Sequence, residues 1–381
     1  ARNAYLFAVS LFFYYKTSGF FFVILIISTI IDFFIGQAIY KSNTPLHKKL
    51  LVGASVVVNL FLLVYFKYSY FFVDFVNDAF GTQITVTNQF AYLTNQTFGS
   101  SFVFDRILLP VGISFFTFQT ISYSVDIYRG LLKPVRNILD FGFYVSFFPQ
   151  LVAGPIVRAS DFIPQLYKEY SLTKQQFGTA LFWILNGLLK KMFLADYIAV
   201  NFVDRVFANP LQYSGFENMM ALFGYSLQVY ADFSGYTDIA IGIALLLGFT
   251  LNINFNSPYK ATSVGDFWRR WHISLSTWLR DYLYIPMGGN RSGSFFSYFM
   301  MFIVMIFVSL LAQSWYVPVV FAGVMLLGYI GSRLSVGFRR WTDTNINMML
   351  TMLLGGLWHG ASWNFVVWGG LNGLGLVVYK L

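Results

Sequence analysis

The chain has 381 residues, of which 57% are hydrophobic and only 11% are charged. Soluble domains carry about 25% charged residues, so this composition excludes an ordinary soluble domain and indicates an all-α protein that crosses the membrane many times. The formal net charge of +9 does not predict nucleic-acid binding, because Lys and Arg are scattered through short loops, as the positive-inside rule describes.

Apolar runs separated by polar or basic loops predict membrane helices through the first third of the chain. These runs lie at residues 4–15, 20–39, 50–75 and 107–127. The loop 41–49 carries three lysines and a histidine and is assigned to the cytoplasm. The polar segment 77–105 has no Lys or Arg and is expected outside, so the loops alternate as consecutive crossings require.

The middle of the chain begins with an irregular apolar segment. The run 140–151 ends in a break at 149–155 that contains two prolines and a glycine, which predicts a re-entrant or interfacial turn. A polar surface stretch containing Arg158 follows the turn. Residues 177–193 predict a further helix.

The long apolar segment 222–249 carries two acids, Asp232 and Asp238. Six residues apart on a helix, their side chains point about 240° apart, so they are not expected to form one carboxylate pair. Each is expected to bond to a neighbouring helix or to a buried cation. The alternative is that both acids are the coupling sites of an ion-coupled transporter.

Residues 265–281 contain three tryptophans, three arginines and His272. Their spacing predicts one amphipathic helix at the membrane interface, with His272 on its buried stripe beside Trp268 and Trp271. A histidine buried beside tryptophans is either a packing residue or part of a functional site, and the pattern leaves both open.

Near the carboxyl end, His359 lies between two apolar runs long enough to cross a membrane. The region before it comprises two hydrophobic segments within 297–332 and a stretch at 333–343 that is expected to be a basic surface segment. Three glycines that permit close backbone approach and a helix break flank the histidine: Gly355, Gly356 and Gly360. Because desolvating an ionisable ring is costly, His359 predicts a functional site, with a hydrogen-bonded packing histidine as the alternative.

In total the pattern predicts about ten to twelve transmembrane or re-entrant helices. No internal repeat and no linker is found, so residues 1–381 are expected to form a single membrane-embedded domain. The chain begins at Ala1 without a Met, and segments at its ends are expected to be missing.

The histidines limit the chemistry. His47 lies in a basic loop and is expected to be solvated, which leaves His272 and His359. Cysteine is absent and the acids lack the spacing of a metal motif, so no metal site is predicted. A general acid/base role remains, in which a buried histidine takes the proton of a hydroxyl that attacks a thioester. A scaffold that recruits an acyltransferase is a third possibility, beside the enzyme and the transporter.

Long stretches of the chain resemble the membrane-bound O-acyltransferase (MBOAT) family, and within it the bacterial alginate and polysaccharide O-acetyltransferase branch. The resemblance rests on LPVGISFFTFQ (109–119), FFPQLVAGPIVR (147–158), YADFSGYTD (230–238), residues 267–285 and residues 353–368. It implies helices arranged around a central tunnel that leads to a buried histidine. In that family the histidine of the Leu-Trp-His-Gly motif is catalytic, which maps onto His359, and His272 matches a second histidine with a supporting role. The positions expected to line the tunnel or bind substrate are Trp358, Gln150, Arg158, Asp232 and Asn364.

The same resemblance implies a reaction and its partners. The acyl group, expected to be acetyl, comes from acetyl-CoA or an acyl carrier protein, with no bound cofactor and no metal. It passes across the bacterial inner membrane to an extracytoplasmic polysaccharide such as alginate, or to a cell-wall glycan, with an SGNH-hydrolase-like acyltransferase as partner. D-alanyl transfer to teichoic acid is the alternative within the family.

Two departures from the family pattern stand out. The segment 295–340 is an apolar insertion where relatives have a short connection. Asn372 stands where a further histidine is often found, so no proton-transfer role is expected there.

Overall fold

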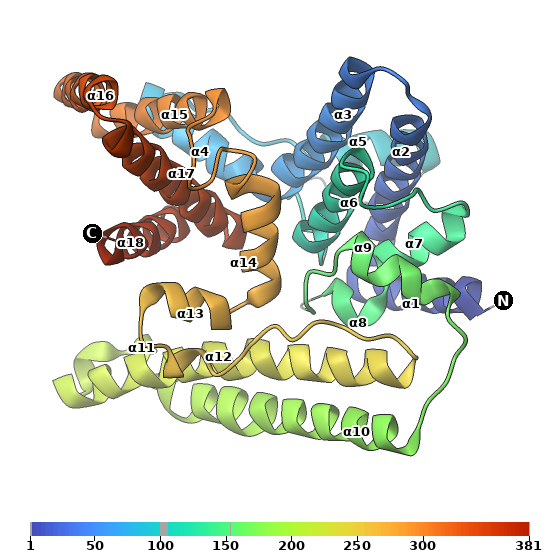
Figure 1. Ribbon diagram of the computed structural model, residues 1–381. Coiled ribbons are helices and arrows are strands. Elements are labelled where there is room, and N and C mark those ends of the chain that lie inside the picture. Colours follow the sequence, from blue (N-terminus) through green and yellow to red (C-terminus); the bar gives the residue numbers. More distant parts are fainter. Residues whose placement is uncertain (1, 100–105, 153, 381) are drawn as a thin grey trace. The chain divides into compact units, whose positions relative to one another are not determined.

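The computed structural model describes residues 2–99, 106–152 and 154–380, and these ranges contain helices and loops but no strand (Figure 1). The all-α prediction is therefore confirmed. Within the same ranges, six helical stretches are long and apolar enough to cross a membrane, which needs about 20 residues. They are Arg2–Lys41, Pro45–Phe80, Lys174–Ala208, Gly215–Leu246, Phe295–Ala312 and Tyr316–Leu334.

The chain folds into two compact units. Unit 1 comprises Ala1–Asn59, Val111–Pro258 and Arg270–Leu275, and unit 2 comprises Leu60–Pro110, Tyr259–Arg269 and Ser276–Leu381. The chain passes between the units several times. The prediction of a single domain is not tested by this grouping and stays a prediction.

Unit 1 is built from helices that pack through glycines and a large aromatic core. Its helices are α1 (Arg2–Ser18), α2 (Phe22–Lys41), most of α3 (Pro45–Leu63), α6 (Ile113–Tyr128), α7 (Ile138–Ser146), α8 (Phe148–Leu151), α9 (Ala159–Phe162), α10 (Lys174–Leu189), α11 (Asp204–Ala208) and α12 (Gly215–Leu246). A Cβ on Gly242 would lie 2.6 Å from the carbonyl oxygen of Ala180, so α10 and α12 approach with backbone almost in contact. The rings of Phe143, Phe162 and Phe249 pack with centroids 5.1–6.0 Å apart.

A buried polar cluster joins α2, α3 and α6 in unit 1. The carboxylate of Asp32, which is 0% exposed, accepts hydrogen bonds from the Ser55 hydroxyl at 2.5 Å and the Asn59 amide at 2.7 Å. The side-chain oxygen Oδ1 of Asn59 accepts in turn from the hydroxyls of Thr120 at 2.8 Å and Ser28 at 3.1 Å. Because buried polar groups are costly unless they are bonded, this cluster ties the three helices together.

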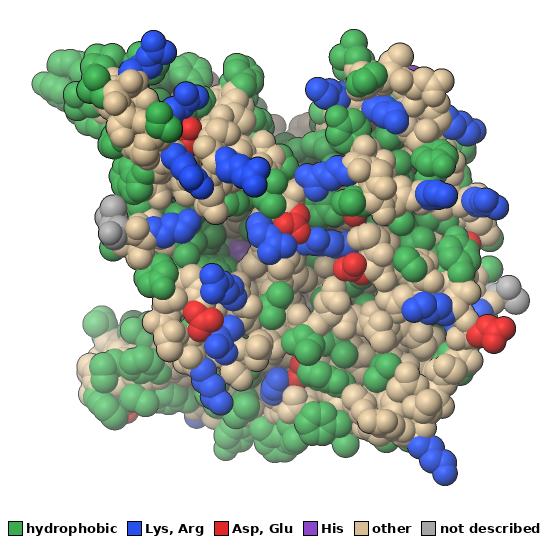
Figure 2. Space-filling view, viewed as in Figure 1, with side chains coloured by type: hydrophobic (Ala, Val, Ile, Leu, Met, Phe, Trp, Pro, Cys, Tyr) green, Lys and Arg blue, Asp and Glu red, His purple; other side chains and the backbone are tan. Residues whose placement is uncertain are grey.

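Unit 2 contains the last residues of α3 and the carboxyl-terminal helices. Its helices are α4 (Ser69–Phe80), α5 (Gln89–Phe98), most of α13 (Val264–Arg270), part of α14 (Ile273–Leu279), α15 (Phe295–Ala312), α16 (Tyr316–Leu334), α17 (Val336–His359) and α18 (Trp363–Tyr379). Only 6% of the apolar window of α15 and none of that of α16 is buried inside the protein. On the face drawn in Figure 2, exposed hydrophobic side chains lie between scattered Lys and Arg side chains.

One sequence-based prediction of local structure is wrong, and a second is confirmed only in part. Residues 265–281 are not one helix, because the chain breaks between α13 and α14 at His272, whose φ is +43°. The basic stretch 333–343 lies at the surface over residues 333–341, as predicted, but α17 already begins within it at Val336, and Asp343 is only 2% exposed. Asp343 is tolerated there because the Tyr298 hydroxyl donates to it at 2.5 Å and Arg339, one turn away, lies at 3.9 Å.

The expected turn after residue 140 is present. Helix α7 ends at Ser146, and the four-residue α8 follows with Pro149 in its first turn. The Gln150 side chain donates to the Tyr144 carbonyl oxygen at 2.8 Å, which bonds one backbone group at the break. Ala153, in the same break, lies outside the described residues, as do residues 100–105 of the expected external loop.

Candidate active site

His359 is the last residue of α17, and the break predicted beside it is confirmed. Residues 360–362 are not helical, and α18 begins at Trp363. His359 as a residue is partly exposed, so it is neither sealed in the core nor fully solvated. A histidine at such an end can present a ring nitrogen to a substrate while the helix fixes its position.

Aromatic rings enclose His359 on several sides. Its imidazole lies edge-on to Trp358 at 5.0 Å and to Trp368 at 5.1 Å, and is stacked near Phe365 at 6.4 Å between centroids. The ring of Trp268, from α13, lies 5.7 Å from that of Trp368. These contacts hold the imidazole by packing and reduce its contact with water.

A π-helical segment, Val64–Tyr68, brings two polar side chains to the end of α17. The Lys67 ammonium donates to the carbonyl oxygen of Trp358, and the Tyr68 hydroxyl donates to that of Leu357 at 2.7 Å. The last carbonyls of a helix have no partner within the helix, and a cation interacts favourably with this negative end. Lys67 and Tyr68 therefore cap the turn that carries His359.

Close packing of α17 and α18 fixes this end of the helix. A Cβ on Gly356 would collide with the carbonyl oxygen of Phe365 and lie 2.9 Å from the Cα of Gly369. A Cβ on Gly373 would lie 2.8 Å from the sulfur of Met349. Only small residues allow two helices to approach this closely, so the glycines noted in the sequence serve packing as well as the break.

His272 lies in unit 1 in a different setting. It is only 1% exposed, which confirms the prediction that it is buried. Its ring is edge-on to Phe233 at 4.7 Å and stacked near Phe255 at 6.4 Å. Next to it, the Asn254 side-chain oxygen accepts from the backbone nitrogen of Ser274 at 3.0 Å and from its hydroxyl at 2.9 Å.

The two acids of α12 do not act as a pair, as predicted. Asp238 accepts hydrogen bonds from Lys190 at 2.6 Å and from Asn186 at 2.7 Å. Asp232 is half exposed and forms an ion pair with Lys191 at 2.5 Å. Each acid is thus balanced by a lysine from the neighbouring π-helical segment Lys190–Asp196, which gives both a structural explanation without ion coupling.

The remaining predicted substrate-binding residues fall in both units. In unit 1, Gln150 is 1% exposed and bonds to backbone, whereas Arg158 is partly exposed just before α9. In unit 2, Trp358 is buried beside His359, and Asn364 is exposed in the first turn of α18. Their roles toward a substrate stay predictions.

Lys67 is the residue of this site that sequence reasoning missed. The signal was present, because a lysine in the middle of the apolar run 50–75 is as unusual as a membrane histidine. Its partner could not be inferred, since Lys67 and Trp358 are separated by 291 residues in the chain.

Comparison with known proteins identifies the family. Residues 135–311 match the model of MBOAT, the membrane-bound O-acyltransferase family. A probable alginate O-acetylase AlgI of Azotobacter vinelandii is 37% identical over 100% of this chain and 63% of its own length. The chain belongs to the membrane-bound O-acyltransferase family. The predicted family and its polysaccharide O-acetyltransferase branch are confirmed, and the chain is a multi-pass membrane protein.

Two further members of the MBOAT family extend the comparison. A peptidoglycan O-acetyltransferase of Helicobacter pylori is 34% identical over 99% of this chain and 64% of its own length. A teichoic acid D-alanyltransferase of Bacillus subtilis is 28% identical over 68% of this chain and 56% of its own length. The chain spans less than two thirds of the length of these curated relatives.

Proposed function

We propose that this MBOAT protein transfers an acyl group, acetyl, from a thioester to a hydroxyl group of an extracytoplasmic polysaccharide or cell-wall glycan. The observation that carries the proposal is the setting of His359. Its imidazole is held at a helix end by packed aromatic rings, and the residue is nevertheless partly exposed. A general base needs both a fixed position and access to the reacting hydroxyl.

In the proposed step, a ring nitrogen of His359 takes the proton of the acceptor hydroxyl as its oxygen attacks the thioester carbonyl. A carbon–oxygen bond forms, the carbon–sulfur bond breaks, and the proton passes to the departing thiolate. The products are an ester and a free thiol. General base catalysis of this kind contributes about 10²–10⁴-fold to a rate.

Lys67 acts in this proposal as a positioning residue. Its bond to the Trp358 carbonyl oxygen fixes the peptide that precedes His359. The cation also lies 5.6 Å from the centre of the Trp358 ring, so one charge holds both the backbone and the side chain next to the base.

The donor, the acceptor and the partner follow by analogy with the family. We take the donor to be cytoplasmic acetyl-CoA or an acyl carrier protein, and the site to be the bacterial inner membrane. The acceptor is alginate or another glycan, reached with an SGNH-hydrolase-like partner. The similarity to relatives named for alginate and peptidoglycan O-acetylation supports this choice.

A second candidate within the same chemistry is D-alanyl transfer to teichoic acid. The similarity to the teichoic acid D-alanyltransferase favours it, but over a smaller part of this chain and at lower identity than the O-acetyltransferases. The two candidates differ only in the acyl group and acceptor, so donor preference separates them.

The test is an acyl-transfer assay with the purified protein in detergent or nanodiscs. Radiolabelled acetyl-CoA, acetyl carrier protein and D-alanyl carrier protein are offered in turn, with alginate, peptidoglycan fragments or teichoic acid as acceptor. We expect acetyl transfer that is lost in His359→Ala and kept in the control His47→Ala, since His47 is exposed in the first turn of α3 (Pro45–Leu63). Full activity of a folded His359→Ala protein would end the proposal.

A further inference from the structure

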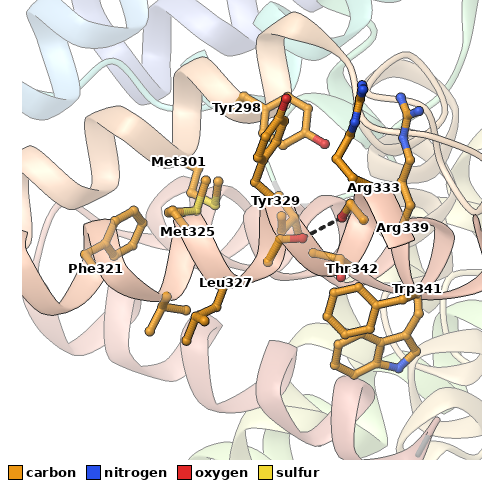
Figure 3. Close-up of a pocket in the computed structure, with 15 residues that line it drawn as sticks. Tyr298, Met301, Phe321, Met325, Leu327, Tyr329, Arg333, Arg339, Trp341 and Thr342 are labelled. Carbon is orange, nitrogen blue, oxygen red and sulfur yellow. Dashed lines mark hydrogen bonds between the residues drawn. The ribbon is translucent and has the colours of Figure 1, made fainter. Parts of the chain in front are cut away.

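A pocket of about 830 Å³ lies among α15, α16 and α17, within unit 2 (Figure 3). Its volume is in the range of small-molecule sites in proteins. Its residues lie between Tyr298 and Ile346, apart from the residues that surround His359. Acyl transfer as proposed above does not use it.

The pocket has an apolar end and a cationic end. Figure 3 shows Met301, Phe321 and Met325 at one end, and Arg333, Arg339 and Trp341 at the other. An apolar end and a cationic end together are complementary to an amphipathic ligand that has an extended apolar part and an anionic head.

The surroundings of the pocket indicate where such a ligand comes from. Helices α15 and α16 have the length and composition of membrane spans, and almost none of their apolar windows is buried by protein. The cationic end lies where α16 ends at Leu334 and α17 begins at Val336, and Trp341 is 44% exposed there. Arginine and tryptophan at the end of a span mark the level of lipid headgroups.

The charges at this end favour an anion. Arg333 is exposed, and in the described part of the chain no ion pair is found for it. Arg339 is 63% exposed at its side chain and lies 3.9 Å from Asp343, whose carboxylate also accepts from Tyr298. One carboxylate therefore offsets two guanidinium groups only in part.

We infer that this pocket binds an anionic phospholipid. An acyl chain lies along Met301, Phe321 and Met325, and the phosphate lies between Arg333 and Arg339. Guanidinium groups bind phosphate oxygens with paired hydrogen bonds, and basic pockets between membrane helices are suited to anionic headgroups. The inference goes beyond acyl transfer and is independent of it.

The first experiment measures lipid retention by native mass spectrometry of the full chain in detergent. Phosphatidylglycerol and phosphatidylcholine with identical acyl chains are compared. We expect selective retention of phosphatidylglycerol, reduced about tenfold in Arg333→Gln/Arg339→Gln, since each basic residue contributes to attraction of an anionic headgroup. The matched control Arg205→Gln/Arg340→Gln removes the same charge from exposed arginines outside the pocket and should retain the lipid.

A second pair of variants tests the apolar end without removing charge. Gly328 lines the pocket and Gly323 does not, and a Cβ at either position meets no atom within 4 Å. Both lie in α16, where leucine is a better helix former than glycine, so neither replacement should unfold the protein. Gly328→Leu should fill the cavity and lower phosphatidylglycerol retention, whereas Gly323→Leu should not.

Three results would overturn the inference. These are equal retention of the two lipids, loss of retention in a control variant to the same extent as in its test variant, and displacement of phosphatidylglycerol by millimolar inorganic phosphate. The last result would assign the cationic end to a soluble anion. None of these readouts depends on acyl transfer, so this inference and the proposed function fail separately.

Discussion

The two histidines of the membrane motifs occupy opposite kinds of environment. His272 is almost fully enclosed at a break where its own backbone is left-handed, whereas His359 is partly exposed at the regular end of a long helix. His272 packs on phenylalanines of unit 1, and His359 lies beside tryptophans and next to a peptide capped by Lys67. A reacting ring must be reachable as well as desolvated, so the comparison favours His359 as the base and His272 as a supporting residue.

The largest expected effect is on the acyl-transfer rate when His359 is replaced, and it distinguishes His359 from His272 directly. His359→Gln keeps a polar side chain of similar size but removes the base, so the acyl-transfer rate should fall about 10²–10⁴-fold. The melting temperature in detergent should stay close to that of the wild type, because His359 is a partly exposed residue. A variant that keeps the rate, or that loses it only by unfolding, would remove the distinction drawn between the histidines.

Close packing beneath His359 should be the next most sensitive feature. Gly356→Ala places a methyl group against the Phe365 carbonyl oxygen, so it should destabilise the protein by about 1–3 kcal/mol. Gly370→Ala is the matched control, since its Cβ would meet only a Leu353 side chain at 3.5 Å. Thermal unfolding of both variants measures the difference, and equal stability would mean that α17 and α18 can move apart at no cost.

His272 should affect stability more than chemistry. A β-branched residue is disfavoured at φ +43°, whereas asparagine tolerates it, so His272→Val should be less stable than His272→Asn by about 1–3 kcal/mol. Unfolding in detergent reports the stability, and the acylation rate of His272→Asn reports the chemistry. If His272→Asn loses as much rate as His359→Gln at unchanged stability, His272 is the reacting group.

Lys67 should give the smallest effect of the four. Lys67→Met removes the cation from the carboxyl end of α17, and we expect kcat to fall about tenfold with little change in KM, because the base is displaced while the substrate still binds. Lys67→Arg should recover most of the rate. A lower melting temperature with unchanged kcat would instead show that Lys67 only caps the helix.

Much of the fold was predictable from residue order. Apolar runs of span length predicted the all-helical membrane fold, and the motifs around 147–158 and 353–368 predicted the family. The break at His359 and the burial of His272 followed from local glycine and aromatic patterns. These features depend on neighbours in sequence, which is why the sequence was sufficient.

Other features arose only when distant segments came together. The helical period placed His272 on one continuous helix, but the chain turns there, and the Asn254 side chain from another segment bonds to Ser274 beside the turn. The sequence places Asp343 in a surface stretch, but the fold buries its carboxylate, which accepts a hydrogen bond from the Tyr298 hydroxyl of another helix. The contact of Lys67 with the Trp358 carbonyl spans 291 residues. Desolvation and hydrogen bonding act between whatever groups the fold brings together, so only the tertiary structure decided these partners.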